Sequence, residues 1–206
     1  MDTWDRTEAD RLALADYLSE LSPAEWSAPS LCADWAVRDV AAHLLVGPTM
    51  SKGKIFRSVV GAGFNLDKMS ATLIARMTGA MSDAELASTM RATAGSRSAP
   101  PGLKPIGVFG EVVVHASDIS LAVGKPLTLP LDHYVIALDH MKGVQPVLGC
   151  KKRIAGLRLH ATDAGWSTGD GPAVEGDAQH LLAAMTGRRQ ALSALSGDGV
   201  AVLQGR

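Results

Sequence analysis

Glu111 and His115 are the two residues whose side chains and spacing most directly indicate chemistry. They are four residues apart in a segment with helical hydrophobic periodicity, so both side chains lie on one helix face, about 5–6 Å apart. A carboxylate and an imidazole in this arrangement can bind one metal ion. The three residues between them are all valine, which indicates a buried helix in which a lone carboxylate would be costly. We therefore expect a divalent metal ion, zinc in the first instance, at this pair.

His43 is the residue expected to supply a third metal ligand, because two protein ligands are too few to hold zinc well. It lies in the middle of a run of core-type residues, 40–45. A single histidine in such a run is interpreted as a hydrogen-bonded core residue, but beside the pair on another helix the metal interpretation is the better one. The other histidines are weaker candidates. His133 and His140 have no acidic or cysteine partner placed to complete a site, His160 falls in a strand-like alternation, and His180 lies in an alanine-leucine helix. We interpret all four as surface or packing residues.

Two helices must carry these three side chains, and the sequence predicts both. Asp34 is expected to cap the first helix, which Gly47-Pro48 ends. The second is expected over residues 108–123, with Gly124 as its end signal. Further helices are expected at residues 4–21, after Ser22, at residues 66–78, after Ser82 and at residues 132–144.

The sequence pattern changes near residue 150. Residues 157–161 alternate as a strand does, Asp177 is expected to cap a helix, and residues 200–203 predict a final strand. We therefore expect a mainly α protein with a helical bundle at residues 1–150 and a small α+β domain at residues 151–206.

The composition, the charge and the cysteine positions exclude several classes of protein. Apolar residues make up 47% of the chain and aromatic residues only 4%, which favours closely packed helices. Twenty basic residues stand against 21 acidic ones without a basic stripe, so no nucleic-acid partner is expected. No apolar run is long enough for a bilayer, the N-terminus is acidic, and neither Cys32 nor Cys150 lies in a CxxC pattern. These features predict a cytoplasmic protein with reduced, structural thiols and no membrane segment.

Three segments, residues 26–44, 110–127 and 166–188, carry motifs found together in one family. They resemble the mycothiol-dependent maleylpyruvate isomerase family, part of the DinB/YfiT-like group of metal-binding proteins. The resemblance implies a DinB-like four-helix bundle with a small C-terminal domain. It also implies mycothiol as the thiol cosubstrate, which actinobacteria use in place of glutathione. The zinc ligands that it implies are His43, Glu111 and His115.

Three protein ligands leave one coordination position of the metal open. A thiol bound there would lose its proton, and the metal-bound thiolate could then attack a small electrophile. Attack on carbon gives an S-transferase, whereas addition to a cis double bond followed by elimination gives a cis–trans isomerase. Asp118 is expected either to orient the imidazole of His115 or to face solvent. Arg188 is expected either to bind a carboxylate of the substrate or to be a solvated surface residue.

Two other functions fit the same ligands. The first is a non-catalytic metal-binding bundle with a regulatory or structural role, in which a fourth protein ligand blocks the open position. The second is a metal-dependent hydrolase, in which that position holds a water whose pKa is lowered to about 7. Nickel or iron could replace zinc at these ligands. For an enzyme, the expected partners are a small electrophile and a low-molecular-weight thiol.

Overall fold

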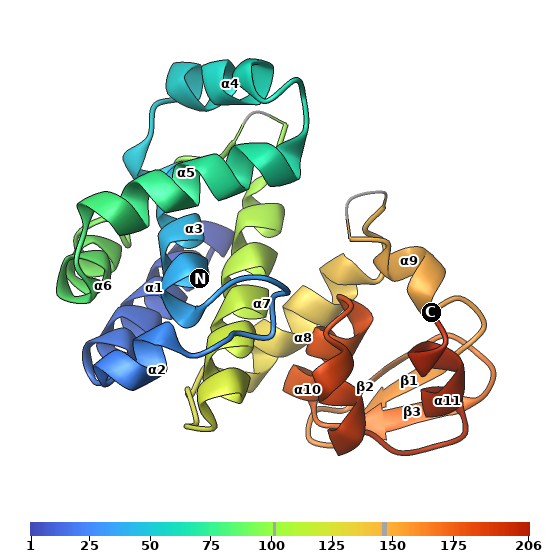
Figure 1. The fold of residues 1–206 in the computed structure, drawn as a ribbon. Coiled ribbons are helices and arrows are strands. Elements are labelled where there is room, and N and C mark those ends of the chain that lie inside the picture. Colours follow the sequence, from blue (N-terminus) through green and yellow to red (C-terminus); the bar gives the residue numbers. More distant parts are fainter. Residues whose placement is uncertain (101, 146–147) are drawn as a thin grey trace. The chain divides into compact units, whose positions relative to one another are not determined.

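The computed structural model describes residues 1–100, 102–145 and 148–206. These residues form two compact units, unit 1 (Met1–Thr128) and unit 2 (Leu129–Arg206). Helices make up most of unit 1, and unit 2 combines helices with a three-stranded sheet (Figure 1). The predicted class, mainly α with a small C-terminal α+β part, is confirmed.

Unit 1 is built from helices that pack in pairs around a shared core. Its helices are α1 (Thr3–Ser19), α2 (Pro23–Ser27), α3 (Val37–Thr49), α4 (Lys52–Gly61), α5 (Leu66–Ala80), α6 (Asp83–Ala92) and α7 (Pro105–Val123). Helices α6 and α7 each pack on both α1 and α3, so these four helices enclose the core. Helix α5 packs on α3, and α4 packs on α5 (Figure 1). The α3–α7 contact matters most here, because it joins the two helices predicted to carry the metal ligands.

The predicted end signals of these helices are only partly confirmed. Ser22 and Ser82 cap α2 and α6 through capping boxes, and Gly124 ends α7 in the left-handed conformation, all as expected. Asp34 does not cap α3. Its backbone is left-handed, with φ of 65°, and the N-cap is Ala36.

The end of α3 and the existence of α4 also differ from expectation. Helix α3 continues through Pro48 to Thr49, and residues 52–61 form a helix although their glycines indicate a loop. Both differences have one cause, because Val46 of α3, Ile55 of α4 and Leu73 of α5 pack in one buried apolar cluster. Burial of these side chains outweighs the weak local propensities.

Unit 2 begins with α8 (Leu131–Met141), and its sheet has the order β2-β1-β3. Strand β1 pairs antiparallel with β2 and parallel with β3. The remaining elements are α9 (Cys150–Arg153), β1 (Arg158–Ala161), β2 (Trp166–Thr168), β3 (Ala173–Gly176), α10 (Ala178–Met185), the 3-10 helix η1 (Arg189–Ala194) and α11 (Gly199–Gln204).

Two expectations for this region differ from the structure. The contacts divide the chain after Thr128 rather than near residue 150, because α8 packs on α10. Residues 200–203 lie in α11 and not in a strand. An isolated bridge between Glu175 and Ser196 occupies the outer edge of β3. That edge is therefore not available for pairing with residues 200–203.

Helix α7 is the core helix of unit 1. It is the one helix of the described residues that is long and apolar enough to cross a membrane by length and composition. However, 72% of that stretch is buried inside the protein. Its apolar character is therefore explained by packing against α1 and α3.

Candidate metal centre

The structure brings the three predicted metal ligands together. His43 projects from α3, and Glu111 and His115 project from α7. One ligand atom of each side chain lies within 4.8 Å of the ligand atoms of the other two. The closest pair is His43 Nε2 and Glu111 Oε1, at 3.0 Å. Packing of α3 on α7 therefore produces the convergence that the sequence predicts.

The donor set fits a zinc ion. Two imidazoles and a carboxylate are ligands that zinc takes at bond lengths of about 2.0–2.2 Å, and small side-chain movements bring the three atoms to that distance from a common point. For a metal ion to bind there, His43 Nε2 must present its lone pair, so the ring hydrogen must sit on Nδ1. The His43 and Glu111 side chains are 18% and 34% exposed, which leaves the cluster open to a small molecule.

The electrostatic surroundings keep Glu111 ionised. Burial alone would raise the pKa of this carboxyl group, because it disfavours the charged form. The hydrogen bond with His43 and the electrostatic interactions with His43, His115 and Arg11 outweigh that effect and lower the pKa below its ordinary value. Glu111 is therefore available as an anionic ligand at neutral pH.

Arg11 is a residue near the cluster that the sequence analysis missed. It is only 2% exposed, and its guanidinium group donates to the carbonyl groups of Ala94 and Ser96. Its charge also acts on Glu111. Its position in the sequence could have indicated that it is buried, because Arg11 shares the buried face of α1 with Leu14 and Leu18.

Asp118 faces His115 and not solvent. Its carboxylate is fully buried, and Oδ2 lies 2.9 Å from His115 Nδ1. An ionised carboxylate can only accept a hydrogen bond, so Nδ1 carries the hydrogen and Nε2 is the nitrogen whose lone pair could bind a metal. This is the arrangement in which a carboxylate fixes the tautomer of a metal-binding histidine.

The loop between α2 and α3 adds two side chains that the sequence analysis did not assign to the site. The ring of Trp35 lies 4.9 Å from that of His43 and 6.2 Å from that of His115, measured between centroids. Cys32 lies with His115 and Asp118 in a second group whose ligand atoms are within 4.8 Å of one another. The Leu31 N–H donates to the Asp118 carbonyl oxygen and ties this loop to α7.

The different surroundings of the two cysteines give a first prediction. Cys150 is fully buried, and burial raises the pKa of its thiol, whereas Cys32 is half-buried beside the metal cluster. Because only an accessible thiolate reacts, the native chain should react rapidly with one equivalent of an aromatic disulfide reagent. The substitution Cys32→Ser should abolish the rapid reaction with the reagent, whereas Cys150→Ser should leave it unchanged. The opposite pattern would show that the two environments are assigned wrongly.

Arg188 belongs to unit 2, where it is buried instead of solvated. Its guanidinium group donates to the Thr186 carbonyl oxygen at 2.9 Å. Its neighbour Arg189 is exposed and donates to the carbonyl of Gln204. The predicted role of Arg188 toward a substrate therefore stays a prediction.

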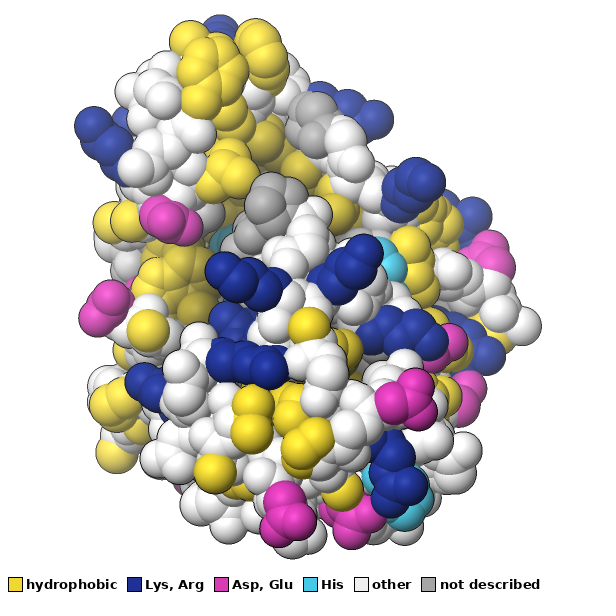
Figure 2. All heavy atoms as spheres, turned by 90° about the vertical axis from the view of Figure 1, so that its right-hand side faces the viewer, with side chains coloured by type: hydrophobic (Ala, Val, Ile, Leu, Met, Phe, Trp, Pro, Cys, Tyr) yellow, Lys and Arg dark blue, Asp and Glu magenta, His cyan; other side chains and the backbone are white. Residues whose placement is uncertain are grey.

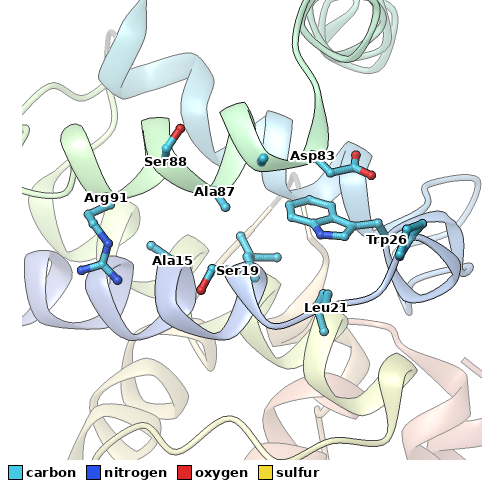
Figure 3. Close-up of a pocket in the computed structure, with 11 residues that line it drawn as sticks. Ala15, Ser19, Leu21, Trp26, Asp83, Ala87, Ser88 and Arg91 are labelled. Carbon is cyan, nitrogen blue, oxygen red and sulfur yellow. The ribbon is translucent and has the colours of Figure 1, made fainter.

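A surface groove between α1, α2 and α6 is not the predicted site (Figure 3). Its volume is about 410 Å³, and its walls are mainly apolar, with Trp26 among them. Its two charged side chains already have partners, since Asp83 pairs with Arg38 and Arg91 pairs with Asp16. The groove therefore offers packing surface but no free charged group for catalysis.

The chain is similar to known proteins in both sequence and fold. Residues 7–105 match the family model described as the mycothiol maleylpyruvate isomerase N-terminal domain. His43 lies inside this span, and Glu111 and His115 follow shortly after it. No curated protein matches the chain.

Two solved structures have a similar fold over nearly the whole chain. One is a mycothiol-dependent maleylpyruvate isomerase in which a histidine is replaced by alanine, with 13% identity and a TM-score of 0.62. The other is a mycothiol-dependent maleylpyruvate isomerase, with 14% identity and a TM-score of 0.54. In both cases the match covers 95% of this chain and 91% of the other. Residues 7–105, just under half of the chain, therefore match the mycothiol maleylpyruvate isomerase N-terminal domain, and the fold of nearly the whole chain is similar to that of the two solved isomerases.

Proposed function

We propose that the protein is a metal- and mycothiol-dependent enzyme that acts on a small electrophile, as a cis–trans isomerase or an S-transferase. The observation that carries this proposal is the convergence of His43, Glu111 and His115 in a chain that matches this N-terminal domain. Mycothiol is proposed as the thiol because the matched domain is that of a mycothiol maleylpyruvate isomerase and both similar structures are mycothiol-dependent isomerases. A reduced thiol cosubstrate also fits a cytoplasmic location.

The residues of the site have separable roles in this proposal. A divalent cation held by His43, Glu111 and His115 would favour the thiolate form of a thiol at neutral pH. Asp118 holds the His115 ring with its Nε2 toward the cluster. Trp35 places an aromatic ring beside the two imidazoles.

The assay that tests the proposal uses maleylpyruvate and, separately, a generic aromatic electrophile, each with mycothiol and the zinc-loaded protein. We expect turnover that requires both the thiol and the metal and that is lost in Glu111→Gln. Isomerisation regenerates the thiol and S-transfer consumes it, so the free thiol remaining at the end distinguishes the two reactions. Turnover without any thiol would instead support the hydrolase.

The position of Cys32 favours one alternative function. Its sulfur lies close to His115 and Asp118, so a movement of its loop could make it a fourth ligand that closes the open position. The protein would then bind a structural or regulatory metal without catalysis. In that case Cys32→Ser would weaken zinc binding, and the fully loaded protein would be inactive with mycothiol and with simpler thiols.

A further inference from the structure

A cleft between α4 and α5 is lined by basic side chains. Its volume is about 580 Å³, within the range of small-molecule sites. Helix α4 contributes Lys54 and Arg57, and α5 contributes Lys68 and Arg76. No acidic residue is among the described residues that line it. Asp67, the acidic residue closest in sequence, is not part of the lining.

These four cations lack the ion pairs that other arginines of unit 1 have. Arg38 pairs with Asp83, Arg91 with Asp16, and Arg97 with Asp5. Within the described residues, no ion pair and no side-chain hydrogen bond involves the charged groups that line the cleft. The formal net charge of the whole chain is −1, so an overall excess of basic residues does not explain their concentration here.

The arrangement is electrostatically unfavourable unless an anion binds. Like charges around one cleft repel each other and attract a negatively charged ligand into it. The hydroxyl groups of the lining, Ser58 and Thr72, donate to backbone carbonyl oxygens of their own helices. Recognition of a ligand would therefore depend on the lysine and arginine side chains.

We infer that the α4–α5 cleft is a binding site for a phosphate-bearing anion, distinct from the metal centre. A carboxylate offers one charge and two oxygens, which a single arginine can satisfy. A phosphate group carries up to two charges and three acceptor oxygens, and a diphosphate carries more, which matches four separate cations. None of the three predicted metal ligands lines the cleft.

The phosphate could belong to a soluble organic phosphate or to a lipid headgroup. Next to the cleft, α4 and the turn after it expose three large apolar side chains, Phe56, Val60 and Phe64. Figure 2 shows apolar side chains gathered at the end of unit 1 that α4 forms, with Lys and Arg side chains beside them. Apolar and basic side chains together are typical of helices that bind an anionic membrane surface.

The test is an NMR titration of the full-length chain with inorganic pyrophosphate, following the backbone amide signals. We expect saturable shifts confined to α4 and α5. The double variant Arg57→Gln/Arg76→Gln should bind at least about tenfold more weakly, because two charge-assisted contacts are lost. The matched control, Lys52→Gln/Lys104→Gln, removes the same charge from exposed lysines outside the cleft and should bind as the unaltered chain does.

A vesicle-binding experiment, compared with the pyrophosphate titration, identifies the source of the phosphate. Cosedimentation with vesicles of phosphatidylglycerol and phosphatidylcholine, lost in the Arg57→Gln/Arg76→Gln variant, would identify a lipid headgroup. Binding of pyrophosphate without vesicle binding would identify a soluble phosphate. The inference is overturned by no response in either experiment, by shifts confined to α3 and α7, by equal binding of both double variants, or by a stronger response to malonate than to pyrophosphate.

Discussion

Replacing His43, Glu111 or His115 by alanine is expected to lower zinc affinity by at least about 100-fold. Loss of a residue that merely supports a metal ligand already costs about 10–100-fold, and loss of a ligand should cost at least as much. Among the described residues these three side chains form the cluster, and two protein ligands alone would hold zinc more weakly. Competition with a chromophoric chelator measures the affinity, and metal analysis of the purified protein gives the stoichiometry.

The same variants should lose the stabilisation that zinc provides. A ligand present at 100 times its dissociation constant stabilises the folded state by about 2.7 kcal/mol. For a chain of this size that corresponds to a rise of roughly 5–10 °C in the midpoint of thermal unfolding. Zinc should produce this rise in the unaltered protein and not in the alanine variants.

His180 provides the matched control for this experiment. It also has an acidic partner, since its Nδ1 lies 2.7 Å from Asp177 Oδ2. Among the described residues, however, this pair is not part of a three-residue cluster. The substitution His180→Ala should therefore leave zinc binding unchanged. Equal zinc content in all four variants and in the unaltered chain would show that the metal is held elsewhere.

Local sequence rules predicted that both helices of the site exist, and they predicted the C-terminal end of α7 but neither end of α3. The four-residue spacing of Glu111 and His115 is a property of one helix, and α7 has the expected end at Gly124. His43 was identified as a candidate because it lies among core residues, and α3 does pack on α7. These features depend on helical periodicity and capping, which are determined by neighbouring residues.

The features that the sequence analysis missed depend on contacts between distant segments. Trp35 and Cys32 reach the cluster because Leu31 hydrogen-bonds to the backbone of Asp118, more than eighty residues later in the sequence. Arg11 reaches Glu111 because α1 packs on α7. Helix α4 forms where its glycines indicate a loop, because Ile55 is buried against other helices. No local pattern encodes such contacts.

Asp118→Ala is expected to weaken zinc binding by about 10–100-fold, although Asp118 is not one of the predicted metal ligands. Without the carboxylate, the His115 Nδ1–H loses its acceptor at 2.9 Å, and the ring can rotate or change tautomer. The buried site should also lose about 1–3 kcal/mol of stability from the unsatisfied donor. Chelator competition measures the first effect, and chemical denaturation without zinc measures the second.

The conservative variant Asp118→Asn separates positioning from simple structural support. Its amide oxygen can still accept from His115 Nδ1–H in the same volume, so most of the affinity should return, while the negative charge is lost. The ¹⁵N chemical shifts of the His115 ring should report hydrogen on Nδ1 in the unaltered and Asn proteins and a mixture of tautomers in the Ala variant. If Asp118→Ala lowers stability but leaves both zinc affinity and the tautomer unchanged, Asp118 supports the fold alone. The observed geometry argues against that outcome, because a fully buried carboxylate pointing at Nδ1 leaves Nε2 as the nitrogen directed to a metal.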